Sequence, residues 1–357
     1  MTTRLRRLST FLLVAIAATS VAGTASAHVR YVVDGPEDVE SIVAFVVSTL
    51  SDPIHAGLVG GGGLATVAGV LAYRRYRPFQ VDLAVFTRTM DAYRDLLPWL
   101  LRLSLGIPLI GAGFTGYFFT PLVESNARIL FIGLGFLMLF GLATRAVAIV
   151  TLVVYLAGLV VEPLLLLQFE YVGGLLALAL VGSGRPSADD VLDDVASDDD
   201  TVYGRIDPIH EFAERFRARI APAEPLAPVA IRVSLGLTFA YLGIVEKLLN
   251  PGYALAVVTK YDLTAIVPVA PELWVVGAAL AEIAVGAVLV VGLYTRAAAA
   301  LSLVLFTLTL FGLPDDPVLA HLTLFGLASA LMITGAGPYS LDDAFGQSPS
   351  KDDATTA

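Results

Sequence analysis

The segment WVVGAALAEIAVGAVLVVGLYTR, from Trp274 to Arg296, is an apolar stretch of helix length that contains a single carboxylate, Glu282. About 20 apolar residues are enough to cross the hydrocarbon core of a bilayer, so the segment predicts a transmembrane helix. Because a lone carboxylate is costly in hydrocarbon, we expect Glu282 either to face the protein interior beside a partner or to stay protonated. Glu282 is therefore the first candidate for a functional site.

The whole chain has the composition of a polytopic membrane protein. Of its 357 residues, 57% are hydrophobic and only 15% are charged, whereas ordinary soluble domains are about a quarter charged. The absence of cysteine excludes disulfides, thiolate metal sites and thiol redox chemistry within the chain. The net charge of -10 comes mostly from acidic segments around Asp189 to Asp200 and after Asp342, and lysine is nearly absent. This pattern predicts a salt-rich cytoplasm, as in a halophile, and gives no sign of a nucleic-acid partner.

Residues 1–27 have the layout of a secretory signal. Arginines at positions 4, 6 and 7 precede an apolar run from Phe11 to about Val21, and Ala25-Ser26-Ala27 is typical of a cleavage site. We therefore predict a signal peptide or an uncleaved anchor. Cleavage would make His28 the first residue, and its amine and imidazole nitrogens together could chelate copper. The alternative for His28 is a solvated terminus without metal.

A further hydrophobic helix is predicted at residues 53–77. It contains four consecutive glycines at positions 60–63 and ends in arginines at 74, 75 and 77. By the positive-inside rule these arginines are cytoplasmic, which places residues 28–52 outside the cell. The glycine run lacks the Lys-Ser/Thr of a phosphate loop, so it favours close packing against another helix.

The remainder of the chain looks duplicated, because three motifs recur in the same order. PWLLRLSLG at 98–106 matches PVAIRVSLG at 228–236, and GLATRA at 141–146 matches GLYTRA at 292–297. A Gly-x-Gly turn followed by Ser-x-Asp-Asp closes both copies, at 182–190 and 335–343. Each copy holds four apolar segments, so the copies share one orientation and form a parallel repeat. The predicted fold is an all-α, polytopic transmembrane protein with about nine crossings and two four-helix repeats.

These motifs set the predicted domain boundaries. The first four-helix unit spans residues 79–190 and the second spans 226–343. Residues 191–225 between them combine an acidic linker with an amphipathic helix that would lie on the inner membrane surface. Residues 344–357 are predicted to be a disordered acidic tail. The expected location is the cell membrane, with the mature N-terminus outside and the C-terminus in the cytoplasm.

The second unit holds the stronger site candidates. Counting back from the shared Thr-Arg pair aligns Glu282 with Phe131, so the first unit lacks this carboxylate. Lys247 and His321 should lie near the outer ends of their helices, where they could form a cluster with Glu282 that opens outward. The alternatives are structural. Lys247 would reach the membrane interface, and His321 would be capped or exposed near Pro317. Glu282 would form an internal ion pair or a hydrogen bond that only fixes helix packing.

Three weaker candidates complete the set. Arg232 and Glu246 could contact a cofactor, although Arg232 could equally reach back to the cytoplasmic surface. Glu170 of the first unit falls near the place of His321. No Ser-His-Asp order, metal-spaced histidine pair, phosphate loop or dinucleotide glycine pattern appears at a credible position.

The second unit resembles the DoxX family of small four-helix membrane proteins. The resemblance is carried by Arg232 to Gly236, Gly243 with Lys247, Glu282 with Gly286, the Gly292 to Ala297 turn, and the ending Thr334 to Asp342. It covers Leu226 to Asp343 well and Leu97 to Asp190 less well. The resemblance implies a membrane-embedded helical bundle linked to respiratory or redox enzymes, because founding members are described as subunits of a thiosulfate:quinone oxidoreductase or a terminal quinol oxidase. This chain departs from the family in its two copies, its additional helix and its lack of cysteine.

Two functional hypotheses follow from these features. In the first, the chain is a subunit or accessory of a quinone-linked membrane redox complex, and Glu282, His321 and Lys247 move protons or contact a quinone headgroup. In the second, it is a non-enzymatic carrier or transporter that binds a small solute or a metal between the repeats, with His28 handling copper. A scaffold without ligand is a third interpretation. The expected partners are the lipid bilayer and redox-enzyme subunits.

Overall fold

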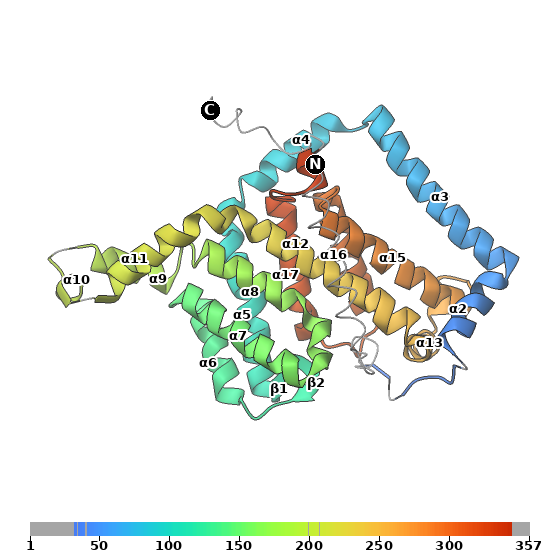
Figure 1. Ribbon diagram of the computed structural model, residues 1–357, viewed down its shortest axis with the longest axis horizontal. Coiled ribbons are helices and arrows are strands. Elements are labelled where there is room, and N and C mark those ends of the chain that lie inside the picture. Colours follow the sequence, from blue (N-terminus) through green and yellow to red (C-terminus); the bar gives the residue numbers. More distant parts are fainter. Residues whose placement is uncertain (1–31, 34, 40, 199, 207, 345–357) are drawn as a thin grey trace.

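The computed structural model describes residues 32–344 apart from 34, 40, 199 and 207. The predicted signal segment, His28 and the acidic tail after Ala344 lie outside the described residues. The rest is an all-α bundle with one short antiparallel β-hairpin (Figure 1). Ahead of the bundle come α2 (Ile42–Ser51), α3 (Pro53–Tyr76) and α4 (Gln80–Asp91).

The bundle helices lie where the apolar segments predict them. The first group comprises α5 (Leu97–Thr115), β1 (Tyr117–Phe118), β2 (Thr120–Glu124), α6 (Arg128–Phe140), α7 (Thr144–Val161), the 3₁₀ segment η2 (Pro163–Gln168) and α8 (Glu170–Val181). The second group comprises α12 (Ala227–Tyr241), the π-helical segment η4 (Leu242–Leu248), α13 (Pro251–Lys260), α14 (Leu263–Ile266), α15 (Pro271–Val291), α16 (Thr295–Gly312) and α17 (Val318–Thr334), followed by α18 (Leu341–Ala344). The hairpin and the short helices α13 and α14 are additions that the sequence patterns did not predict.

The helices are of membrane-spanning character. Within the described ranges, six helices are long and apolar enough to cross a bilayer, and four shorter helices are also apolar. The shorter ones include α6, α8 and α17, which fall below the usual span of about 20 residues. The chain is therefore a multi-pass membrane protein, as predicted, while the count of nine crossings stays a prediction.

Buried arginines connect the recurring motifs of each group. The guanidinium of Arg102 on α5 donates to the carbonyls of Met138 and Leu139 at the end of α6, and to those of Ser183 and Pro186 after α8. Arg232 on α12 makes the matching bonds to the end of α15 and to the turn after α17. Both side chains are at most 3% exposed. Each arginine therefore ties three helix ends together.

The turns between α6 and α7 and between α15 and α16 are shaped by the same motifs. Gly141 and Gly292 end their helices at φ of 70° and 67°, a left-handed conformation that glycine adopts without strain. The carboxylate of Asp189 accepts from the N–H groups of Ala143 and Thr144, and Asp342 accepts in the same way from residues 294 and 295. These bonds satisfy the free N–H groups at the starts of α7 and α16. We call the end of the bundle that carries these turns the arginine end, and the opposite end the loop end.

The centre of the bundle is formed by α5, α8, α12 and α17 (Figure 1). Here α8 packs on α12, and α17 packs on α5. A Cβ added to Gly173 on α8 would lie 1.8 Å from the Ser234 hydroxyl, and one on Gly326 of α17 would lie 1.7 Å from the Ser104 hydroxyl. The first helix of each group thus packs against the last helix of the other group, at equally close range.

Helix α3 stands away from this bundle (Figure 1). None of its residues is buried, and its contact with the arginine end runs through Tyr73, whose ring lies 5.7 Å from that of Tyr294. No described atom lies within 4 Å of a Cβ built on any of the glycines at 60–63. The structure therefore does not bear out the expected close packing of the glycine run against another helix of this chain.

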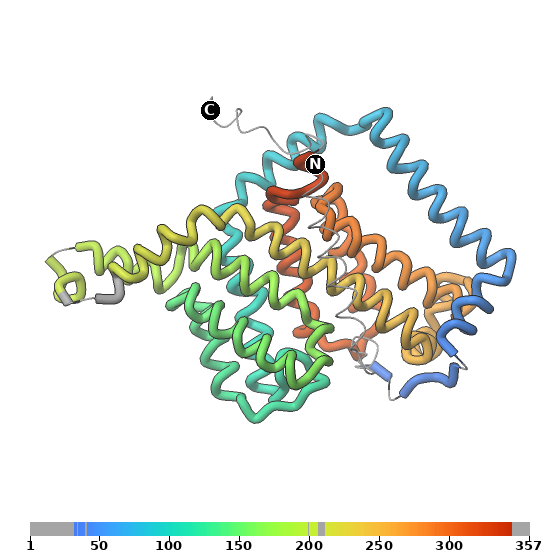
Figure 2. Tube along the Cα trace, viewed as in Figure 1, coloured from blue at the N-terminus to red at the C-terminus, as the bar shows by residue number. Residues whose placement is uncertain are grey.

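The segment between the two groups is helical. Its acidic part forms α9 (Ala188–Ala196), which Ser187 caps by accepting from the N–H of Asp190. After α10 (Val202–Ile206), α11 (Pro208–Ile220) continues through a 3₁₀ segment into α12, and Figure 2 shows this run bending as it leaves the bundle. The predicted amphipathic helix is present, and its place on the membrane surface stays a prediction.

Replacement of Gly173 by alanine tests the close packing of α8 on α12. The added methyl would overlap the Ser234 side chain and the Ala230 carbonyl oxygen, which is 2.3 Å away. Overpacking of this kind costs about 1–3 kcal/mol, so we expect a lower thermal unfolding midpoint in detergent. Gly133→Ala on α6 is the matched control, because nothing lies within 4 Å of its added Cβ. Equal midpoints for the two variants would contradict this packing.

Candidate functional site

Glu282 has a partner inside the protein, as the sequence required. The Nζ atom of Lys247 donates to both carboxylate oxygens of Glu282 at 2.7 Å. The two side chains are 14% and 20% exposed, so the pair is mostly but not fully removed from its surroundings. An ion pair with both oxygens engaged greatly reduces the cost of placing each charge in a low-dielectric region.

The π-helical segment η4 positions Lys247. It continues α12 with a wider turn, and such turns often occur at functional sites. Close approach of η4 to α15 depends on Gly243, because a Cβ there would lie 2.7 Å from the Ala279 carbonyl oxygen. This contact lies one turn away from Lys247 and from Glu282, and so brings the two side chains within bonding distance.

The first group of helices has an aromatic cluster at the matching place. Phe131 stands where the alignment puts Glu282, and it is fully buried. Its ring lies 5.2 Å from Phe118 and 5.0 Å from Phe119, both in edge-to-face geometry. Phe119 also contacts the rings of Tyr155 and Tyr171. The ion pair and the aromatic cluster are therefore alternative ways of filling similar helix junctions.

His321 is paired with a different carboxylate. Its Nε2 atom lies 3.4 Å from Asp316 Oδ2, and its Nδ1 atom lies 3.4 Å from the Pro317 carbonyl oxygen. Both side chains are buried at the loop end, where α17 begins. The cluster predicted from Glu282, Lys247 and His321 is thus seen as two pairs. The sequence analysis did not identify Asp316. The pattern Asp315-Asp316-Pro317, directly before an apolar helix, could have indicated a carboxylate near His321.

The two proposed cofactor contacts have different surroundings. All five guanidinium N–H groups of Arg232 point to backbone carbonyl oxygens, those of Leu289, Val290, Ala336, Pro338 and Tyr339. This arrangement engages the donors of Arg232 with the backbone, and a cofactor contact for Arg232 stays a prediction. Glu246 is fully buried on η4, beside Lys247 in the chain. A cofactor contact for Glu246 stays a prediction.

A buried carboxyl group also lies at the junction of the two helix groups. Glu170 begins α8 and has no exposed surface. The Thr238 hydroxyl on α12 lies 3.2 Å from Glu170 Oε2. Comparison of the two sequence units indicated only that Glu170 corresponds roughly to His321, and it did not predict the contact of Glu170 with α12.

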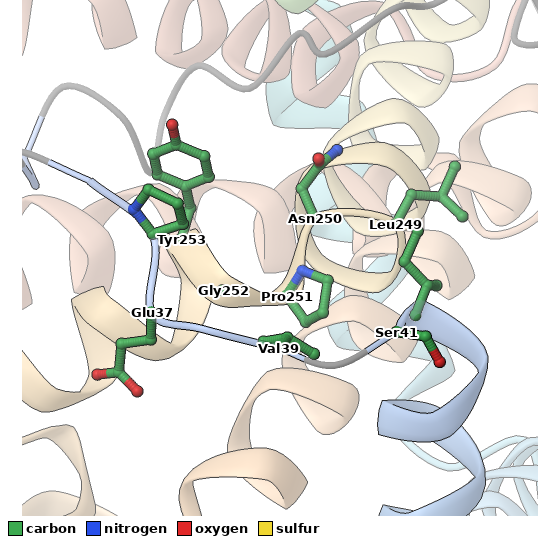
Figure 3. Close-up of a pocket in the computed structure, with 10 residues that line it drawn as sticks. Glu37, Val39, Ser41, Leu249, Asn250, Pro251, Gly252 and Tyr253 are labelled. Carbon is green, nitrogen blue, oxygen red and sulfur yellow. The ribbon is translucent and has the colours of Figure 1, made fainter.

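A groove lies at the loop end beside η4 (Figure 3). It has a volume of about 390 Å³ and lies between the segment before α2 and the start of α13. Its walls combine apolar and polar side chains, namely those of Pro36, Glu37, Val39, Ser41, Ile42, Leu249, Asn250, Pro251 and Tyr253, with Gly252. Leu249 in the wall of the groove follows Lys247 by two residues, so the groove and the ion pair are close along the chain.

No metal centre is seen in the part of the chain that the structure describes, since no three His, Asp or Glu side chains are grouped to hold an ion. His28 lies outside the described residues. Its copper chelate stays a prediction.

Single and double substitutions of the ion pair should not be additive. Lys247→Met leaves the Glu282 charge without its partner, and breaking a buried pair in this way costs about 3–5 kcal/mol. Joint replacement in Lys247→Met/Glu282→Leu removes both charges and should recover most of the loss. Unfolding midpoints of the single and double variants in detergent measure this coupling. Additive losses would mean that the two side chains do not interact.

The stability contributed by Asp316 should fall as pH rises. Burial raises the pKa of the Asp316 carboxyl from 3.8 to about 7, so the folded chain binds a proton that the unfolded chain has lost. Between those two values the unfolding midpoint of the wild type should therefore decline with increasing pH relative to Asp316→Asn. Asp315→Asn is the control: Lys260 and Tyr261 lower the pKa of the Asp315 carboxyl, so its contribution is lost only at acid pH. A wild-type profile parallel to that of Asp316→Asn would contradict this assignment.

Comparison with known proteins identifies the second helix group. A family model described as DoxX matches residues 227–322, from the start of α12 into α17. The match includes Arg232, Lys247, Glu282 and His321, and it confirms the resemblance over that range. No curated protein and no solved structure matches the chain. Residues 227–322 of this multi-pass membrane protein are therefore a DoxX family domain.

Proposed function

We propose that the chain is a membrane subunit of a quinone-linked redox complex, in which the Lys247–Glu282 pair exchanges protons with a quinone headgroup. The observation that carries the proposal is the ion pair itself, which lies within the DoxX domain and retains partial exposure. Packing of this helix junction does not require the two charges, since Phe131 fills the corresponding place in the first helix group with aromatic contacts.

The chemistry of quinones suits this pair. Reduction of a quinone to a quinol takes up two electrons and two protons, and the protons must reach the two carbonyl oxygens. The ammonium group of Lys247 can donate a hydrogen bond to a headgroup oxygen, while the carboxylate of Glu282 can accept the proton of a bound quinol. The electrons would pass to or from a partner redox subunit. The role of the pair is therefore to supply or remove protons.

The groove beside η4 offers a place for approach from the loop end. Its wall pairs aliphatic side chains such as Val39 and Leu249 with the polar groups of Asn250 and Tyr253. A ring with apolar faces and two carbonyl oxygens requires such a mixture. We propose that a headgroup or a proton reaches Lys247 through this groove.

We further propose that residues 79–190 are a second DoxX-like copy that lost the ionisable pair and kept the scaffold. In support, Arg102 and Arg232 make matching bonds to helix ends, and Asp189 and Asp342 cap matching turns. Both copies would have the arginine end in the cytoplasm, since Arg145, Arg185 and Arg296 follow the rule for positive loops. The first copy would serve to complete the bundle.

The carrier function has less support. It requires a binding space between the two helix groups, but α8 and α12 approach so closely that one added methyl on Gly173 would overlap Ser234. The copper variant of this function depends on His28, which lies outside the described residues, and on the outer acidic residues.

Glu282→Gln tests the proposed function. The amide keeps the size of the side chain but cannot take up a proton, and loss of a general acid or base typically costs 10²–10⁴-fold in rate, so we expect a decrease of about 100-fold or more in quinol-linked turnover. Turnover is measured in membranes that contain the full chain with its co-purifying subunits.

Phe131→Leu is the matched control, because it changes the corresponding position of the first helix group. It should leave quinol-linked turnover within about twofold of the wild type. A folded Glu282→Gln protein with unchanged turnover would remove the Lys247–Glu282 pair from the mechanism.

A further inference from the structure

A second buried carboxyl group, that of Glu170, has surroundings unlike those of Glu282. In the described part of the chain, Glu170 forms no ion pair, and its Oε1 atom has no hydrogen-bond partner. The side chain has no exposed surface. An ionised carboxylate without a cation would be strongly disfavoured there, whereas a neutral carboxylic acid would not.

The hydrogen bonds around Thr238 point the same way. The Thr238 Oγ1 atom lies 3.1 Å from the Ser234 carbonyl oxygen and 3.2 Å from Glu170 Oε2. A threonine hydroxyl carries one proton, and the Ser234 carbonyl can only accept. Because one proton cannot serve both contacts, a protonated Glu170 that donates to Thr238, while Thr238 donates to the carbonyl as threonine in a helix commonly does, accounts for both distances.

The matching position in the second helix group argues that packing does not require this carboxyl. Glu170 precedes Gly182 by 12 residues, and Thr323 precedes Gly335 by the same number. Thr323 uses its hydroxyl to donate to the Ser104 carbonyl of α5, at 3.0 Å. A neutral hydroxyl is therefore sufficient to join α17 to α5, whereas α8 places an ionisable group against α12.

The position of Glu170 along the membrane is also informative. It precedes Val181, the last residue of α8 at the arginine end, by 11 residues, and at 1.5 Å per residue this is roughly 17 Å. Tyr155 and Tyr171, whose rings stack at 6.1 Å, are the titratable groups of the aromatic cluster beside it. No described Lys, Arg or His forms an ion pair with Glu170 at this depth.

We infer that Glu170 is a proton-binding site at the junction of the two helix groups, a neutral carboxylic acid that donates to Thr238. This site goes beyond the proposed quinone function and does not rest on it. It gives the first helix group an ionisable centre of its own, separate from the Lys247–Glu282 pair.

Infrared spectroscopy of the purified full-length chain at neutral pH tests this inference. A protonated carboxyl group absorbs at a C=O stretching band that is well separated from that of a carboxylate and moves to lower frequency in D₂O. We compare the wild type with Glu170→Gln, with Glu282→Gln as the paired-carboxylate control and Glu246→Gln as a second fully buried carboxyl.

The expected result is the loss of one protonated carboxyl group per chain in Glu170→Gln, with carboxylate absorption unchanged. Glu282→Gln should show the reverse: the protonated band stays and one carboxylate is lost. Thr238→Val, which keeps Glu170, should move that band to higher frequency because the acid loses its acceptor, and so provides a readout if Glu170→Gln does not fold.

A Glu170→Gln spectrum that keeps the whole protonated band and loses a carboxylate would overturn the inference, because it would mean that Glu170 is ionised. That outcome would not bear on quinol-linked turnover in Glu282→Gln.

Discussion

The fold depends on two buried arginines whose guanidinium groups bind the ends of neighbouring helices. A helix in a membrane satisfies its backbone within itself except in its last turn, where four carbonyl oxygens lack partners. Arg102 and Arg232 supply donors to such oxygens at the ends of α6 and α15, and their other N–H groups bind carbonyls of the turns that follow α8 and α17. The bonds fix the ends of α6 and α15, and the turns after α8 and α17, relative to α5 and α12.

Other residues of the recurring motifs bind further backbone groups at the same end of the bundle. Asp189 and Asp342 cap the starts of α7 and α16, and Arg145 and Arg296 donate to the last carbonyls of α8 and α17. Anionic groups at helix starts and cationic groups at helix ends also match the helix dipoles. The motifs that recur in the sequence are thus explained by backbone satisfaction at one end of the bundle.

Within this common framework the two helix groups carry different interiors. The second group holds the Lys247–Glu282 pair where the first holds Phe131 and its aromatic neighbours. The first group holds Glu170 where the second holds Thr323. Packing alone could be achieved with an aromatic side chain at the first of these places and a hydroxyl at the second. The first group has the aromatic side chain, Phe131, and the second group has the hydroxyl, that of Thr323. The uneven distribution of carboxyl groups is therefore where function is to be sought, and the two groups supply different kinds of site, one a charged pair and the other an uncharged acid.

The sequence by itself determined the membrane character of the chain, the limits of most bundle helices, the DoxX resemblance of the second group, and the need of Glu282 for a partner. These follow from apolar length, turn residues and the cost of a charge in hydrocarbon, all of which act locally along the chain. Only the tertiary structure decided that Lys247 is that partner, that His321 pairs with Asp316, and that Glu170 meets Thr238 across the two groups. Such contacts depend on how helices far apart in sequence are rotated and brought together, here by Gly243, Gly173 and the π-helical turn of η4, and a pattern along one helix does not reveal which neighbour its polar side chain will face.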